Sequence, residues 1–355
     1  MIKILIINPF GIGDVLFTTP VIRAIKNTWP DASISYWCNE RVREIFENNP
    51  DIDKVFALSR GDLKRVFSQS KINGIKKLLS LFFKIKKGKF DIALDYSLDH
   101  RYGLIAKLAG IKRRIGFNYK FRGRFLTERI DLDKYSGKHI VEWYLSLLKF
   151  LEIKPKESHL EIFVPKKDKE AALRLLSEAG ISYNNLIIGI APGAGASWGK
   201  DAAFKHWPAE NFACLIDLLH DKLGAKVVVL GDFLEKHIAE TIRKSAKNKF
   251  IDLIGVTDLG SLIAVIGNLR LLIANDGGPM HIAAALGINT VSIFGPVDEV
   301  VYGPYPASDK HIVIKSSVSC RPCYQNFKLP ICQKNKECIK SITVEEVFDA
   351  ARRLI

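Results

Sequence analysis

Short apolar runs with the composition of β-strands alternate with helix-like stretches along nearly the whole chain of 355 residues. The strand-like runs are residues 2–7, 32–37, 90–94, 113–116, 186–191, 226–230, 250–253, 271–274 and 290–294. Regular alternation of strands and helices builds βαβ units, whose strands lie side by side in a parallel sheet. We therefore predict an α/β protein with parallel sheets.

The alternation is interrupted between residues 151 and 185. Two polar, proline-marked segments, 154–156 and 165–167, flank an isolated helical stretch there, as expected for a connection between domains. The chain is also too long for one ordinary domain. We predict two doubly wound, Rossmann-like domains, residues 1–165 and 166–355, that face a central cleft. The final helix can pack back on the N-terminal domain.

The composition is that of a globular protein, with 48% hydrophobic and 26% charged residues. No apolar run reaches the ~18 residues that are needed to span a bilayer. The N-terminal run holds a single cation, Lys3, and Asn8-Pro9 ends it, which indicates a first strand rather than a signal peptide. We therefore expect a cytoplasmic protein.

Positive charge is concentrated in the N-terminal half. Of the net charge of +15, residues 1–150 carry +13, because 28 Lys and Arg side chains oppose 15 Asp and Glu side chains. A partner rich in phosphate or carboxylate is expected at this half, although charge alone does not separate nucleic acid from anionic lipid. The basic stretch 60–89 carries apolar residues at helical spacing. This fits a packed crossover helix at least as well as a helix on a membrane surface.

The first strand runs into a glycine turn, Pro9-Phe10-Gly11-Ile12-Gly13-Asp14. Glycines at this place allow a tight turn and a close approach of the backbone to a ligand. Leu16 stands where the dinucleotide fingerprint needs a small residue, which argues against a nicotinamide cofactor. Asp14 has two interpretations, a catalytic carboxylate or a cap of the next helix, and the local pattern alone favours the cap.

A second glycine-rich segment, residues 191–198, follows a strand of the second half and leads to Lys205-His206-Trp207-Pro208. Its backbone and Ser197 offer hydrogen-bond donors, and Lys205 offers a positive charge for a phosphate. The alternative for Lys205 is a solvated surface charge.

A third segment, Asn275 to Ala285, joins a strand to an apolar helix through Asp276, Gly277 and Gly278. Small residues at a helix start leave the first backbone N–H groups open to a diphosphate. His281, one turn into the helix, could donate to the same group. A lone histidine on such a helix is more often a core residue.

Together these segments resemble glycosyltransferase family nine, the ADP-heptose:lipopolysaccharide heptosyltransferases. The resemblance covers nearly the whole chain and keeps the family's order and spacing. Its elements are the Gly-x-Gly-Asp start through Pro20, Lys205–Pro208, Asn275–His281 and Phe294-Gly295-Pro296. The resemblance implies a GT-B fold, with an acceptor-binding N-terminal domain and a nucleotide-sugar-binding C-terminal domain. It also implies inverting transfer of heptose from ADP-heptose to the Kdo- or heptose-bearing lipid A of the lipopolysaccharide inner core.

By the same resemblance, Asp14 looks like the catalytic base. The positions that look donor-binding are Ser197, Lys205, Asp276, Gly277, Gly278 and His281. The family often has Ser or Thr where this chain has Gly277, so a hydroxyl contact to the donor phosphate is missing here. Candidates for acceptor binding are Gly13, Arg113 and Arg114.

The resemblance further implies that the reaction needs no metal ion and no cofactor besides the nucleotide-sugar donor. It implies peripheral contact with the cytoplasmic face of the inner membrane and no nucleic-acid partner. The stretches Asp51-Ile52-Asp53 and Asp131-Leu132-Asp133 imitate the metal-binding motif of another glycosyltransferase class. Both sit in loop-like settings before strand patterns, so we expect turns there instead of metal sites.

Three competing functions are kept. The same fold could use a different nucleotide sugar in surface-polysaccharide synthesis. A nicotinamide-dependent oxidoreductase is disfavoured by Leu16. A non-catalytic protein that binds a sugar nucleotide or lipopolysaccharide would keep the segment from Asp276 to His281 but could dispense with Asp14.

Four of the six cysteines crowd the C-terminal part of the chain, as Cys320-x2-Cys323-x8-Cys332-x5-Cys338. The first pair has the spacing of zinc ligands, and four thiolates complete a tetrahedron. A redox pair and unpaired thiols are the alternatives, and the sequence does not choose among the three.

Overall fold

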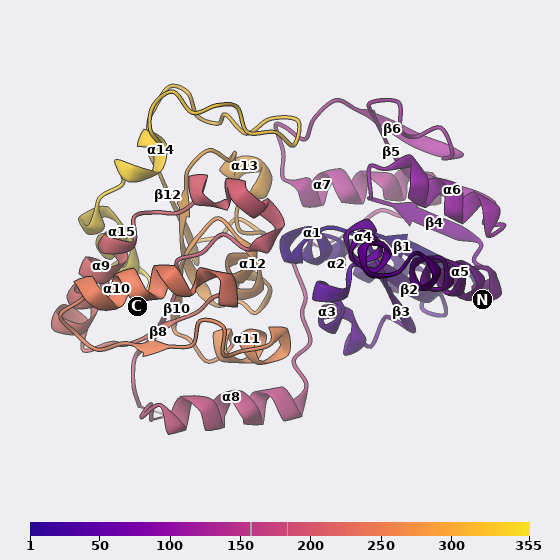
Figure 1. Cartoon of the computed structure of the whole chain (residues 1–355). Helices are drawn as coiled ribbons and strands as arrows, with labels where there is room; N and C mark the ends of the chain where they lie inside the picture. Colours follow the sequence, from indigo (N-terminus) through magenta and orange to yellow (C-terminus); the bar gives the residue numbers. More distant parts are fainter. Residues whose placement is uncertain (157, 183) are drawn as a thin grey trace. The chain divides into compact units, whose positions relative to one another are not determined.

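The computed structural model describes residues 1–156, 158–182 and 184–355, and for Arg60, Ala196, Ser197 and Lys200 it describes the backbone alone. The chain divides into two compact units, Met1–Phe163 and Val164–Ile355, and each is built on a six-stranded parallel sheet (Figure 1). The α/β class with parallel sheets, which we predicted from the alternation, is confirmed.

The sheet of the N-terminal unit has the strand order β3-β2-β1-β4-β5-β6. Its strands are β1 Lys3–Ile7, β2 Ser33–Cys38, β3 Lys54–Ala57, β4 Ile92–Asp95, β5 Arg113–Tyr119 and β6 Glu128–Leu132. Ile4 of β1 pairs with Ile34 of β2 on one side and with Ile92 of β4 on the other. The chain adds β2 and β3 on one side of β1 and then crosses to β4, so the strand order reverses between β1 and β4. Doubly wound sheets bind ligands at the carboxyl ends of the strands beside such a reversal.

The sheet of the C-terminal unit repeats this plan with the order β12-β11-β10-β7-β8-β9. Its strands are β7 Ile187–Ala191, β8 Lys226–Val229, β9 Ile251–Asp252, β10 Leu271–Asn275, β11 Asn289–Phe294 and β12 His311–Lys315. Leu271 of β10 pairs with Ile188 of β7, and the order reverses between these two strands. The carboxyl ends of β7 and β10 are therefore the expected ligand site of this unit.

Helices connect the strands in both units. Those of the N-terminal unit are α1 Ile12–Leu16, α2 Thr19–Thr28, α3 Glu44–Glu47, α4 Arg60–Gln69, α5 Lys71–Gly88, α6 His100–Leu108 and α7 Ile140–Leu145, with the 3₁₀ helices η1 Glu40–Val42 and η2 Ser146–Leu151. Those of the C-terminal unit are α8 Lys166–Glu178, α9 Ala209–Leu223, α10 Lys236–Ser245, α11 Leu259–Ile266, α12 Gly278–Ala285, α13 Glu299–Tyr302, α14 Glu337–Lys340 and α15 Val344–Arg353, with η3 Ala196–Phe204 and η4 Phe233–Glu235. Across the described residues, every helix is too short or too polar to pass through a bilayer.

The last helix, α15, belongs to the core of the C-terminal unit. Its apolar residues Val347, Ala350 and Ala351 are fully buried there, in the cluster that also holds Leu219 of α9 and Ile293 of β11. Burial of that face stabilises the helix on its own sheet.

Three strands absent from our sequence prediction, β3, β6 and β12, all lie at the edge of a sheet. β6 alternates between half-buried and exposed residues and carries charged side chains, as edge strands commonly do. The Asp131-Leu132 pair lies at the end of this strand, so our expectation of a turn before a strand was wrong at this place. Asp53 precedes β3 as expected, and its carboxylate accepts the Ser33 hydroxyl at 2.7 Å.

Candidate active site

The glycine turn after β1 places Asp14 at the reversal point of the N-terminal sheet. Asp14 is the third residue of α1, and its carboxylate accepts the backbone N–H of Gly11 at 3.3 Å. The side-chain amide of Asn8 donates to the Asp14 carbonyl at 2.9 Å. Gly11 is the N-cap of this helix, so Asp14 is not the N-cap that the local pattern favoured, and its contact with Gly11 is that of the third helical residue in a capping box. Gly13, the preceding residue, lies in the same helical turn. The side chain of Asp14 keeps part of its surface exposed, which a base that must reach a substrate needs.

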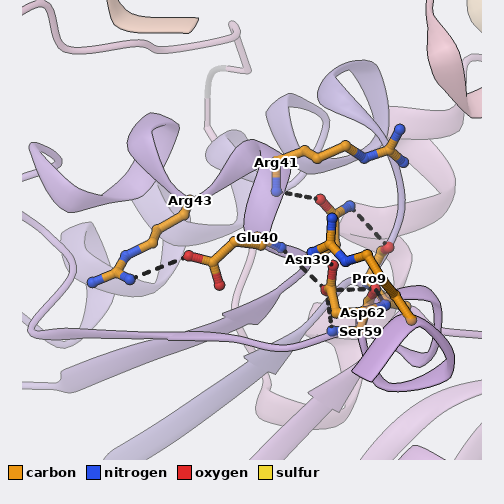
Figure 2. A network of polar contacts seen from close by, with 8 residues as sticks. Pro9, Asn39, Glu40, Arg41, Arg43, Ser59 and Asp62 are labelled. Carbon is orange, nitrogen blue, oxygen red and sulfur yellow. Dashed lines mark hydrogen bonds and ion pairs between the residues drawn. The ribbon is translucent and has the colours of Figure 1, made fainter. Parts of the chain in front are cut away.

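A polar network holds this turn against the ends of β2 and β3 (Figure 2). The side-chain amide of Asn39, directly after β2, donates to the carbonyl of Pro9 at 3.1 Å and also to that of Phe10. The Asp62 carboxylate accepts both the N–H and the hydroxyl of Ser59 at 2.7 Å. Burial raises the pKa of Asp62, but these hydrogen bonds outweigh burial and hold that pKa below its usual value. The network fixes the Pro9–Phe10 backbone that leads into Asp14.

A second carboxyl group, Asp95, ends β4 opposite Ile7 of β1. Asp95 is 6% exposed, and burial raises its pKa to about 6, although hydrogen bonds from Ser97 act in the opposite direction. One of these is the Ser97 N–H, 2.9 Å from Oδ1. Asp95 was not among the site residues predicted from the sequence. The available signal was an acidic residue at the carboxyl end of a buried strand.

The structure does not bring Arg113 and Arg114 to the edge where Gly13 and Asp14 lie. Both arginines begin β5, and Arg113 pairs with Ile92 at the start of β4, so they lie at the amino edge of the sheet. Arg113 forms an ion pair with Glu128 at 2.9 Å. Arg114 donates to the Phe125 carbonyl at 2.6 Å. These contacts give both side chains a structural role within the unit.

In the C-terminal unit, Lys205 and Asp276 form a buried pair at the reversal point. Lys205 Nζ lies 2.7 Å from Asp276 Oδ2, and the two residues are each 4% exposed. The pair is an ion contact that lacks the alignment of a hydrogen bond. Lys205 Nζ also lies 4.3 Å from the centre of the Trp198 ring, a cation–π contact. Lys205 is therefore not a surface charge, and two of our predicted donor-binding residues lie in direct contact.

Asn275, the last residue of β10, joins the segments that carry this pair. Its amide nitrogen donates to the Pro192 carbonyl after β7 at 2.6 Å, and its amide oxygen accepts the N–H of Trp207 at 3.2 Å. Trp207 is itself 1% exposed, and its indole N–H donates to the Ile342 carbonyl. The loop after β7, the residue before Asp276 and the residues after Lys205 are thus fixed to one another.

Helix α12 starts directly after Asp276. Gly277 is its N-cap in extended conformation, with φ −177° and ψ 179°, and Gly278 is its first residue. Backbone N–H groups of the first helical turn have no partner within the helix, which suits them to an anion. His281 lies one turn further on and is 5% exposed, in agreement with the core interpretation of this residue. Ser197 lies in η3, and its side chain is outside the part of the chain that the structure describes.

The carboxylate of Glu235 occupies a cradle beside the loop after β7, and our sequence analysis missed it. One carboxylate oxygen accepts the Gly195 N–H at 3.2 Å, and the other accepts the Asp232 N–H at 2.8 Å. A Cβ at Gly193 would stand 1.8 Å from this carboxylate, so any other residue there would displace the Glu235 side chain from its cradle. The available signal was an acidic residue soon after the second strand of a βαβ unit, the place where dinucleotide-binding folds bind a ribose hydroxyl.

The four C-terminal cysteines line one pocket, which Phe204 and Pro296 also border. All four are free thiols, and the Lys336 N–H lies 3.3 Å from the sulfur of Cys332. Among the described residues, no three His, Cys, Asp or Glu side chains are placed as a metal site.

Two doubly wound units, each with a glycine-rich turn at its reversal point, are the architecture of GT-B glycosyltransferases. The description "Glycosyltransferase family 9 (heptosyltransferase)" belongs to a family model that matches residues 78–330. The chain belongs to this family and is a glycosyltransferase, as the sequence motifs predicted.

Named relatives span nearly the same length as this chain. It is 26% identical over 298 residues to lipopolysaccharide heptosyltransferase 3 of Escherichia coli, a match that covers 82% of this chain and 83% of the relative. It is 25% identical over 359 residues to lipooligosaccharide heptosyltransferase 2 of Campylobacter jejuni, covering 99% and 98%.

Solved structures have the same fold. The family 9 glycosyltransferase of Veillonella parvula superposes with a TM-score of 0.83 at 27% identity, covering 99% of this chain and 96% of that one. The E. coli ADP-heptose heptosyltransferase II superposes with a TM-score of 0.77 at 22% identity, covering 99% and 98%. The GT-B fold predicted from the resemblance is therefore confirmed.

Proposed function

We propose that this glycosyltransferase moves heptose, with inversion, from ADP-heptose to the Kdo- or heptose-bearing lipid A of the lipopolysaccharide inner core. The observation that carries the proposal is the buried Lys205–Asp276 pair at the start of α12, whose lysine brings an ammonium group to the reversal point of the C-terminal sheet. The names of the relatives support the sugar and the acceptor, since the E. coli protein is a lipopolysaccharide heptosyltransferase.

In this proposal the C-terminal unit binds the donor. Lys205 has three N–H donors, so it can contact a diphosphate oxygen while Asp276 holds it in place. The N-terminal N–H groups at Gly277 and Gly278, with His281 one turn further along α12 and Ser197 in the segment after β7, complete the diphosphate site. The carboxylate of Glu235, beside Gly195, accepts hydrogen bonds from the ribose hydroxyls of the donor nucleotide. A solved E. coli heptosyltransferase with ADP supports adenosine diphosphate as the nucleotide.

The reaction needs one proton acceptor and stabilisation of one leaving group. Asp14 removes the proton of the acceptor hydroxyl as its oxygen attacks the anomeric carbon. The bond from that carbon to the diphosphate oxygen breaks, and the electron pair leaves with ADP. Lys205 and the positive end of α12 stabilise the developing charge, an effect worth a few kcal/mol per donor. This charge supply supports a mechanism without a metal ion.

The acceptor side is assigned to the N-terminal unit. Its surplus of basic residues, +13 over residues 1–150, suits an acceptor with acidic sugars and phosphates. Because the acceptor carries a lipid anchor and the donor is a nucleotide sugar, we place the enzyme in the cytoplasm, in peripheral contact with the inner membrane.

A donor panel tests the proposal. Transfer to a Kdo-bearing lipid A acceptor is measured with ADP-heptose, ADP-glucose, UDP-glucose and GDP-mannose at equal concentrations. We expect product with ADP-heptose, and stabilisation of the protein against heat by ADP but not by UDP or GDP. Preferential stabilisation by UDP or GDP, together with transfer from the matching sugar nucleotide, would replace the proposed donor.

A further inference from the structure

Helix α5 carries large apolar side chains on the side that faces away from the core. Ile72, Ile75, Leu79 and Phe83 are between 47% and 67% exposed. With 3.6 residues per turn, positions three, four and four apart fall on one narrow stripe of a helix. We call these four residues the α5 stripe.

The opposite face of α5 already attaches the helix to the N-terminal unit. Gly74, Leu81 and Ile85 are its buried residues, and Leu81 and Ile85 belong to the core cluster that contains Leu5 of β1. The α5 stripe therefore takes no part in attaching the helix to the N-terminal unit. A helix that is apolar on two opposite faces needs a second apolar environment for the face that the core leaves open.

Positive charge surrounds the α5 stripe. The helix carries no acidic residue, and its exposed lysines are Lys71, Lys76, Lys77, Lys84, Lys86 and Lys87. Among the described residues of this unit, the ion pairs engage none of these six lysines. Lysine stems are long enough to keep the ammonium groups in a polar layer while the stripe lies deeper.

We propose that the α5 stripe and its lysines form an interfacial anchor that seats the N-terminal unit on a bilayer with anionic headgroups. Four apolar side chains enter the boundary between headgroups and acyl chains, and the lysines bind the negative surface beside them. The inference rests on the proposed function in one respect, because a lipid-anchored acceptor brings the enzyme to such a surface.

A bilayer fits these observations better than the two other partners that the charge suggests. A second copy of the chain, docked through the same helix about a two-fold axis, would place six lysines opposite six lysines. A nucleic acid would use the lysines through its phosphates, but phosphate contacts do not bury a row of four aliphatic and aromatic side chains.

Vesicle flotation tests the anchor without any sugar donor or acceptor. The full chain is mixed with two kinds of vesicle. One kind is phosphatidylcholine alone, and the other also contains about 30% phosphatidylglycerol, which gives the vesicle a negative surface. We expect binding to the anionic vesicles only, weakened by high salt. Leu79→Gln with Phe83→Gln should lower the partition coefficient at least tenfold. The control pair Leu108→Gln and Leu173→Gln removes similarly exposed apolar residues on α6 and α8 and should leave binding unchanged.

A charge series separates the lysines from the stripe. Lys76→Gln, Lys84→Gln and Lys86→Gln should each lower binding to anionic vesicles about fivefold. The matched control replaces exposed lysines of the C-terminal unit, Lys244, Lys247 and Lys249, by glutamine. Equal losses in both sets would mean that net charge alone is responsible, which would overturn the anchor.

The remaining outcomes are also decisive. Failure of the wild-type chain to bind anionic vesicles would overturn the inference. A dimer seen in sedimentation equilibrium would also overturn it if the Leu79→Gln and Phe83→Gln pair abolishes that dimer. The same holds for DNA binding that this pair of substitutions abolishes. Transfer to a lipid-free acceptor fragment without vesicle binding would remove the anchor and keep the proposed function. Vesicle binding without transfer would keep the anchor and remove the proposed function.

Discussion

Replacement of Lys205 by methionine separates the structural role of the buried pair from its role in donor binding. Both partners are 4% exposed, so removal of the lysine leaves a carboxylate buried without a counter-charge. Loss of one partner of a buried ion pair typically costs about 3–5 kcal/mol of stability. We therefore expect Lys205→Met to lower the free energy of unfolding by that order.

The cost should be relieved when the carboxylate is also removed. Lys205→Met combined with Asp276→Asn buries no unpaired charge, so most of the lost stability should return. ADP binding should not return, because a charged contact to phosphate, worth about 1.5–3 kcal/mol, is absent in both variants. Its loss corresponds to a tenfold or larger rise in Kd.

Urea unfolding and calorimetric titration with ADP measure the two quantities on the same samples. Lys249→Met, at an exposed position of the same unit, is the matched control and should change neither. Wild-type ADP affinity in Lys205→Met would remove this lysine from the donor site. Wild-type stability in that variant would refute the buried-pair argument.

Two further variants test single positions. Gly277→Ser places a Cβ at 3.5 Å from Ala194, an ordinary contact, in extended backbone. The serine should stabilise α12 by a few tenths of a kcal/mol and improve ADP binding up to about tenfold. Weaker ADP binding by this variant in calorimetry would contradict a phosphate position beside residue 277. Asp95→Asn tests the pH dependence of stability. The pKa of Asp95 in the folded chain is about 6 against an ordinary 3.8, so wild-type stability is lost as pH rises through this window, by about 3 kcal/mol at most. The variant should be more stable than wild type at pH 8 and lose this advantage near pH 4. If the free energies of unfolding in urea differ between variant and wild type by the same amount at both pH values, the result would count against the buried carboxyl.

The sequence allowed prediction of the buried strands and of the glycine-rich segments that follow them at the reversal points, because both leave local patterns. β1 and β10 read as continuous apolar runs since both of their faces are buried. The edge strand β6 alternates charged and apolar residues, and β3 has only four residues, so both leave weak patterns. The edge strand β12 does hold an apolar run, Ile312 to Ile314, and the prediction missed it.

The missed and misplaced site residues depend on contacts between distant segments. Glu235 reaches Gly195 across 40 positions of the chain, and Asn39 reaches Pro9 across 30. Arg113 and Arg114 are basic residues that suit the acidic acceptor implied by the resemblance, but charge does not say which end of a strand faces the ligand edge. Only the register of β5 with β4 supplies that information.

Asp14 carries the central claim that the N-terminal turn supplies the base. Asp14→Asn keeps an acceptor oxygen for the Gly11 N–H, so stability and ADP affinity should stay at wild-type values. Asp258→Asn, at the N-cap of α11, is the matched control and should leave transfer unchanged.

Single-turnover transfer from saturating donor, with a melting curve on the same samples, is the most direct measurement. We expect transfer by Asp14→Asn to fall about 10²–10⁴-fold while the melting temperature stays within about a degree or two of wild type. Near-normal transfer by a folded Asp14→Asn enzyme would contradict it, since Asp14 would then be a helix cap and the proton would leave by another route.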